Sequence, residues 1–128
     1  YFYELLGDSS GKSQVMLRNK GGDLGTSMSF SLEQMPCFSL WKNTASLQNG
    51  YVTGLEPGSN FPNPKRFERE NGRVVLLEPM TSRKFELSLE VHLGIEAVSE
   101  VEKEINLLQG STSPEILEFA PKNLSAAT

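Results

Sequence analysis

Apolar and polar residues alternate along most of the first 93 positions, a pattern typical of β-strands with one buried face. The clearest run covers residues 85–93, and a second covers residues 27–32, where serine alternates with larger apolar side chains. The apolar positions of the first run are Phe85, Leu87, Leu89, Val91 and Leu93. Shorter segments predict further strands at residues 1–6, 15–17, 38–42, 51–56 and 74–77.

The connections between these strands differ in length and composition. The glycine- and serine-rich residues 7–11 predict a hairpin that joins the first strand to residues 15–17. The polar residues 43–50 predict a turn between two strands. Residues 58–71 contain Pro62 and Pro64 and no periodicity, so we expect a long loop, and loops of that length are usually functional or disordered.

The period changes after Gly94. Apolar residues then recur at helical spacing, which predicts a helix over residues 96–108 that ends at Gln109 and Gly110. By default its apolar face packs on its own sheet, and a partner-binding helix is the alternative. We therefore predict an all-β antiparallel sandwich, or part of one, in residues 1–93. A C-terminal helix in residues 94–110 and a flexible tail in residues 111–128 complete the predicted organisation.

Composition narrows the classes of function. The 128 residues are 38% hydrophobic and 22% charged, as in a soluble globular domain, and the net charge of −4 disfavours nucleic acid as a partner. No apolar run reaches the roughly 18 residues that span a bilayer, and this piece of sequence contains no signal peptide, so we expect no membrane contact and a cytoplasmic location. The chain starts at Tyr1 in what reads as mid-strand, so we expect it to belong to a longer protein.

Cys37 is the single cysteine, which excludes an internal disulfide and a multi-cysteine metal site. It follows Pro36 in an apolar setting, where a thiol is most often a small core residue. We expect no metal and no cofactor.

Glu56 is the residue best placed for chemistry. It stands at the end of a predicted strand and is followed by Pro57, which restricts its backbone and aims its carboxylate from the rim of a sheet. By spacing alone, a solvated surface glutamate is the more frequent outcome.

The segment around Glu56 resembles a known family. The sequence Gly54-Leu55-Glu56-Pro57, then Phe61-Pro62-Asn63 and Leu77-Glu78-Pro79 before the long last strand, is similar to the C-terminal region of galactose mutarotases. With Trp41-Lys42 upstream, the chain looks closer still to an aldose-epimerase-like branch of unknown function. The resemblance covers residues 1–93 and implies a galactose-mutarotase-like supersandwich.

The resemblance also implies an activity. Mutarotases interconvert the α and β anomers of an aldose: a glutamate takes the proton of the C1 hydroxyl while a histidine protonates the ring oxygen. Glu56 matches the base. No residue of this chain matches the acid, because the histidines of the family lie upstream of the matching region. The expected partner is a monosaccharide or sugar derivative, and exposed strand edges suggest pairing with a second copy.

Three further residues are candidates for substrate binding: Trp41, Lys42 and Asn60. An aromatic ring at the rim of a sheet suits the C–H face of a pyranose, and a tryptophan buried in the core is equally compatible with the pattern. Asn60 follows Glu56 closely and is suited either to hydrogen bonding with sugar hydroxyls or to a turn.

The remaining polar candidates have simpler explanations. His92 lies on the polar side of residues 85–93, and we expect an exposed histidine without a catalytic role. Arg66, Arg69 and Arg73 suit an anionic substituent such as a phosphate or carboxylate, but solvated loop charges paired with Glu68 and Glu70 are the stronger expectation.

Two functions remain open, and a third possibility is that the region survives only as a structural domain. One is an isomerase of the aldose 1-epimerase kind in the full-length protein, with Glu56 as general base. The other is a non-catalytic carbohydrate-binding module of the same fold. They differ in whether an acid stands opposite Glu56.

Overall fold

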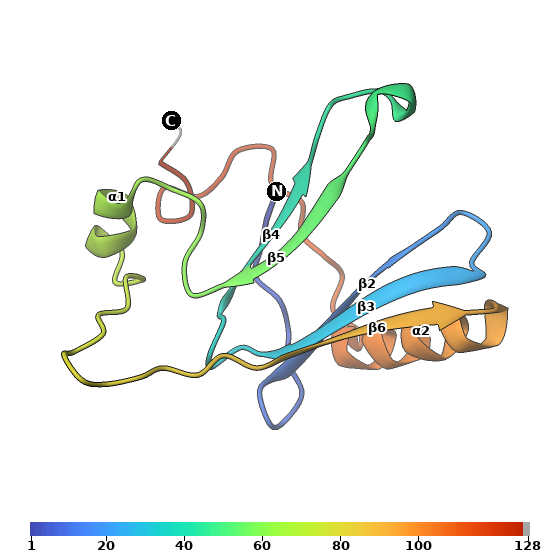
Figure 1. Ribbon diagram of the computed structural model, residues 1–128, viewed down its shortest axis with the longest axis horizontal. Coiled ribbons are helices and arrows are strands. Elements are labelled where there is room, and N and C mark those ends of the chain that lie inside the picture. The colour runs from blue at the N-terminus through green and yellow to red at the C-terminus, as the bar shows by residue number, and fades with distance from the viewer. Residues whose placement is uncertain (127–128) are drawn as a thin grey trace. The chain divides into compact units, whose positions relative to one another are not determined.

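Two three-stranded antiparallel sheets and one 15-residue helix form most of the regular structure in residues 1–126, the part of the chain that the computed structural model describes (Figure 1). The residues form two compact units. The first unit comprises Tyr1–Leu5, Gln34–Lys84 and residues 117–126, and the second comprises Leu6–Glu33 and Phe85–Ile116. The antiparallel sheets and the C-terminal helix confirm the predicted fold class.

The sheet of the first unit has the order β1-β4-β5. Its strands are β1 (Phe2–Tyr3), β4 (Cys37–Lys42) and β5 (Thr53–Gly58). A ten-residue connection with a 3₁₀ turn, η1 (Leu47–Asn49), joins β4 to β5, as the polar residues 43–50 predicted. The buried apolar side chains of this unit are Met35, Cys37, Phe38 and Phe61. The burial of Cys37 confirms its assignment as a core residue.

The predicted hairpin at residues 7–11 is wrong. β1 pairs with β4 instead of the next strand along the chain, with Phe2 opposite Ser39 and Tyr3 opposite Phe38. Phe2 also stacks on Phe61, with ring centroids 4.7 Å apart. Aromatic packing against distant residues therefore overrides the local turn signal.

The predicted strand at residues 74–77 and the predicted loop at residues 58–71 also need correction. Residues 74–77 form no strand in the structure, and the loop contains a short helix, α1 (Lys65–Glu70). Pro64 precedes α1, where a proline fits because its missing N–H has no helical acceptor, and Arg66 pairs with Glu70 one turn later. A strand must pair with another strand, and residues 74–77 take part in no strand pairing within the described part of the chain.

The sheet of the second unit has the order β2-β3-β6. Its strands are β2 (Lys12–Arg18), β3 (Leu24–Ser31) and β6 (Leu87–Leu93). The helix α2 (Ile95–Gln109) packs on one face of this sheet (Figure 1). The predicted flexible tail, residues 111–128, stays a prediction, and its last two residues lie outside the described part of the chain.

The helix α2 packs against small residues of β3. Val98 of the helix is 1% exposed, and a Cβ atom on Gly25 would lie 3.5 Å from its Cγ2. Ser27, two residues further along the same face, is also buried. Glycine and serine let the helix axis approach the sheet closely, so the helix covers the polar side of β3.

The apolar phase of β6 therefore faces away from α2. We expected these residues to be buried, but Leu89 is 61% exposed, and Leu87, Val91 and Leu93 are also exposed. His92, expected at the surface, is half-buried on the helix-facing side, and its Nε2 lies 2.7 Å from Ser27 Oγ. Periodicity identified the two faces of β6, but it could not show which of them the helix covers.

Candidate functional site

Trp41 and Glu56 lie on the same face of the β4–β5 ribbon. In the antiparallel register, Trp41 pairs with Gly54 and Ser39 pairs with Glu56, so these four residues share one face. Trp41 and Glu56 are diagonal neighbours there, a relation within reach of an aromatic side chain. The indole of Trp41 is 50% exposed, so it is not a core residue of the described chain.

The carboxylate of Glu56 is exposed and is held by no hydrogen bond or ion pair within residues 1–126. A Cβ atom placed on Gly54 would lie 2.6 Å from Glu56 Oε1, which shows that the Glu56 side chain folds back along the strand. The site thus offers an available carboxylate beside an exposed aromatic ring.

Lys42 lies on the opposite face of the ribbon. It pairs with Thr53 and alternates with Trp41, and its Nζ lies 5.1 Å from the centre of the Tyr1 ring, a cation–π distance. The structure therefore brings Trp41 and Glu56 together and leaves Lys42 apart from them.

Asn60 lies in the connection that follows β5. Its side-chain amide donates a hydrogen bond to the Phe61 carbonyl at 2.7 Å, as in a residue that shapes a turn. It also lines a cavity of about 320 Å³ within the first unit. The other residues that line this cavity are Ser59, Asn63, Lys65, Glu68, Val74 and Val75.

A buried ion pair anchors this connection, and sequence reasoning did not give it that role. Glu68 is fully buried and accepts hydrogen bonds from Arg73 Nε at 2.6 Å and from Arg73 Nη2 at 2.7 Å. It also accepts hydrogen bonds from the Phe61 N–H at 3.2 Å and from Asn63 Nδ2 at 2.7 Å. Hydrogen bonding from Arg73 is the main reason that the pKa of Glu68 is lowered.

Arg73 is therefore a structural residue. Its guanidinium lies 5.5 Å from the centre of the Phe61 ring and 5.8 Å from that of Phe67. The expected pairing of Arg66 with Glu70 and of Arg73 with Glu68 is confirmed, but the Arg73–Glu68 pair is buried and not solvated as expected. In the sequence, Phe67 precedes Glu68, and Arg73 follows five residues after Glu68. This pattern is too common for the sequence alone to predict a buried ion pair.

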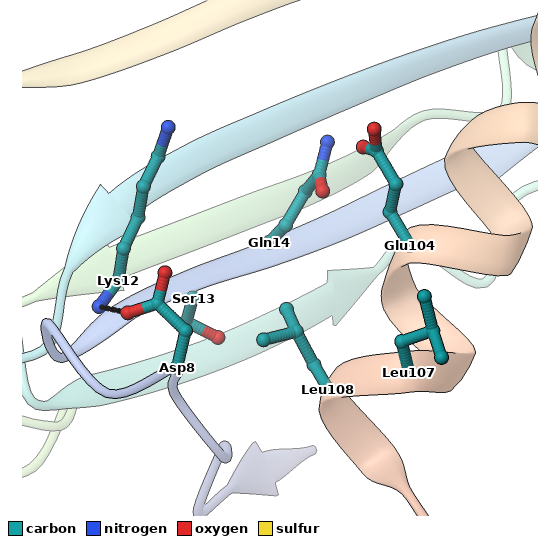
Figure 2. Close-up of a pocket in the computed structure, with 7 residues that line it drawn as sticks. All are labelled: Asp8, Lys12, Ser13, Gln14, Glu104, Leu107 and Leu108. Carbon is teal, nitrogen blue, oxygen red and sulfur yellow. Dashed lines mark hydrogen bonds between the residues drawn. The ribbon is translucent and has the colours of Figure 1, made fainter.

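A second hollow, of about 260 Å³, lies in the second unit between residues 8–14 and α2 (Figure 2). Asp8, one of the residues that line this hollow, stabilises the turn in which it lies. Its carboxylate accepts hydrogen bonds from the Ser10 hydroxyl at 2.7 Å and from the Lys12 N–H at 3.0 Å. Hydrogen bonding from Ser10 is the main cause of the lowered pKa of Asp8. The hollow is also lined by a second carboxylate, that of the exposed Glu104 of α2 (Figure 2).

No group of three or more His, Cys, Asp or Glu side chains suited to a metal ion occurs in the described residues. The helices of the same residues include none that is long and apolar enough to cross a membrane.

Comparison with solved structures defines the class of the fold. The chain superposes with a TM-score of 0.82 on a protein from Klebsiella pneumoniae subsp. pneumoniae named as a "putative aldose 1-epimerase", with 36% sequence identity. The match covers 88% of this chain and 29% of the relative. The chain thus has an aldose-1-epimerase-like β-sandwich fold, and it spans less than a third of that protein.

A match to a protein-family model shows the family to which the chain belongs. The model of a domain of unknown function, DUF4432, matches residues 1–91, and the chain belongs to this family. A search of the curated proteins found no match. Fold and family confirm the resemblance to an aldose-epimerase-like branch that the residues around Glu56 suggested.

Proposed function

We propose that this chain forms the part of an aldose-1-epimerase-like protein that carries the general base and binds the sugar. The observation that carries the proposal is the shared face of Trp41 and Glu56, with an exposed indole and a carboxylate without a partner in the described residues. The likeness to the Klebsiella pneumoniae protein supports the same function. Because the chain covers 29% of that relative, we assign turnover to a protein of the relative's full length.

In the proposed reaction the pyranose stacks on Trp41, and Glu56 accepts the proton of the C1 hydroxyl. An acid donates a proton to the ring oxygen, and the bond between C1 and that oxygen breaks to give the open-chain aldehyde. Rotation about the C1–C2 bond and the reverse proton transfers close the ring in the other anomeric form. Removal and donation of protons by positioned groups typically contribute on the order of a hundred- to ten-thousand-fold each.

The acid of this reaction is not assigned to a residue of this chain. The Nε2 atom of His92, the only histidine in the sequence, is already in contact with Ser27. We therefore propose that the acid comes from another part of the full-length protein. Without such an acid, the same face would serve as a carbohydrate-binding module.

Sugar binding can be tested on this chain directly, because Trp41 is its single tryptophan. We expect D-galactose or D-glucose to change Trp41 emission in a saturable way, and we expect L-arabinitol, which has no ring, to leave it unchanged. Glu56→Gln should weaken binding, whereas Glu4→Gln, an exposed glutamate of the same unit, should not. If emission does not respond to either aldose, the proposal that this face binds sugar is wrong.

A further inference from the structure

Gly54 is a glycine whose backbone does not require one. It lies within β5, and its φ is not positive, unlike that of six other glycines among the described residues. A glycine inside a strand weakens the strand and often marks a close approach of other atoms. An explanation for Gly54 must therefore come from the space above it.

The side chain of Glu56 fills that space. A Cβ atom on Gly54 would lie 2.6 Å from Oε1 of Glu56 and 3.3 Å from its Cδ and Cγ, and these are its three nearest heavy atoms. Real Cβ contacts essentially never fall below 3.0 Å. The carboxylate can thus occupy its place only while residue 54 has no side chain.

The direction of this fold-back matters because of Trp41. Gly54 pairs with Trp41 across the ribbon, so a carboxylate that lies over Gly54 stands in the same cross-strand row as the indole. The three heavy atoms nearest to the Gly54 position all belong to Glu56 and none to Trp41, so the carboxylate lies closer to that position than the indole does. The Glu56 carboxylate thus occupies the space that a side chain at residue 54 would fill.

We propose that Gly54 is a positioning residue that holds the Glu56 carboxylate beside Trp41, at the edge of a sugar stacked on the indole. The inference rests on the proposed function for its catalytic consequence, but the geometry is independent of it. A methyl group at residue 54 meets the end of a flexible side chain, not the backbone, so Gly54→Ala turns the carboxylate away and leaves the strand intact.

The position of the carboxylate can be followed without any sugar. A carboxylate beside an indole alters the emission of that indole, so Trp41 emission at a fixed neutral pH should differ between the wild-type chain and Glu56→Gln. We expect Gly54→Ala to change the emission in the same direction as Glu56→Gln. Thr53→Ala, on the opposite face of the same strand, should keep the wild-type emission.

Two more measurements complete the test. In the wild-type chain, NMR should show an NOE between the Gly54 α-protons and the Glu56 γ-protons, which needs no variant to fold. In the full-length protein, Gly54→Ala should lower kcat on the order of a hundredfold with little change in KM, as expected for a misplaced catalytic group.

The outcomes separate the two proposals. If the NOE is absent, or if Gly54→Ala keeps the emission of the wild type, the positioning role of Gly54 is wrong whether or not the protein turns over sugar. If the NOE and the change in emission are found but aldoses neither bind nor react, the positioning role stands and the proposed function fails.

Discussion

Glu68 shows how a single buried carboxylate holds the segment that follows Glu56. Its oxygens accept hydrogen bonds from the backbone N–H of Phe61 and from Asn63, so the carboxylate ties α1 to the connection after β5. Asn63 in turn donates to the Leu124 carbonyl at 3.0 Å and accepts from the Ala126 N–H at 3.0 Å. Arg73 balances the charge, so the loss of either partner leaves a poorly solvated ion.

We predict that Glu68→Gln destabilises the first unit by about 3 kcal/mol, because Arg73 is left without its counter-charge in a mostly buried position. Urea unfolding followed by Trp41 emission reports on this unit. Glu70→Gln removes the exposed ion pair with Arg66 and should cost less than about 0.5 kcal/mol. Equal effects of the two substitutions would contradict the structural role of Glu68.

The same carboxylate predicts a dependence of stability on pH. The pKa of Glu68 is lowered from its ordinary value of 4.5, mainly by hydrogen bonding from Arg73. Its stabilisation is therefore fully present above the pKa of the unfolded state and is lost as the pH falls through the lower pKa of the folded state. We expect the free energy of unfolding of the first unit to decrease on acidification below about pH 4.5 and to decrease less steeply in Glu68→Gln. Parallel curves for the two proteins would show that Glu68 does not titrate in this way.

At the residue scale, the sequence predicted Glu56 and Trp41 as candidates, but it could not show which candidates share a face with Glu56. Which residues share its face depends on the register of β4 and β5, and a shift of one residue would have moved Trp41 to the opposite face. The ten-residue connection between these strands is too long for its turn chemistry to determine that register. Lys42 was placed with Trp41 by proximity along the chain, whereas alternation separates them.

At the scale of elements, β6 and α2 were predicted well as elements and less well in their packing. Strand β6 begins at Leu87, two residues later than expected, and α2 covers Ile95–Gln109, close to the predicted 96–108. Hydrophobic periodicity identifies a strand and its two faces. The side that α2 covers is decided by Gly25 and Ser27 of β3, whose small side chains admit the helix, and periodicity does not report that fit.

We predict that two substitutions of apolar residues in the second unit change its stability by different amounts. Val98→Ala should destabilise this unit by about 2 kcal/mol, because two buried methyl groups are lost from the contact with Gly25. Leu89→Ser should change stability by less than about 0.5 kcal/mol, because Leu89 is exposed. Chemical denaturation followed by circular dichroism compares them, and a large loss in Leu89→Ser would show that the apolar face of β6 is covered in solution.

At the scale of the whole molecule, the fold and the family are established, whereas the reaction is proposed. The fold class and the family were accessible from sequence because the residues from Gly54 to Asn63 form a specific pattern. The complete set of catalytic groups was not accessible, because the chain covers 29% of the solved relative and includes no assigned acid. A base without its acid should leave anomer exchange near the spontaneous rate.

The central claim is that Glu56 is the general base, and anomer exchange by the full-length protein tests it most directly. NMR exchange spectroscopy on α- and β-D-galactose would compare wild-type protein, Glu56→Gln and the matched control Glu4→Gln. We predict that the wild type and Glu4→Gln accelerate exchange equally, that Glu56→Gln is slower on the order of a hundred- to ten-thousand-fold, and that residues 1–128 alone give no acceleration. Full activity in Glu56→Gln, or acceleration by residues 1–128 alone, would contradict the account.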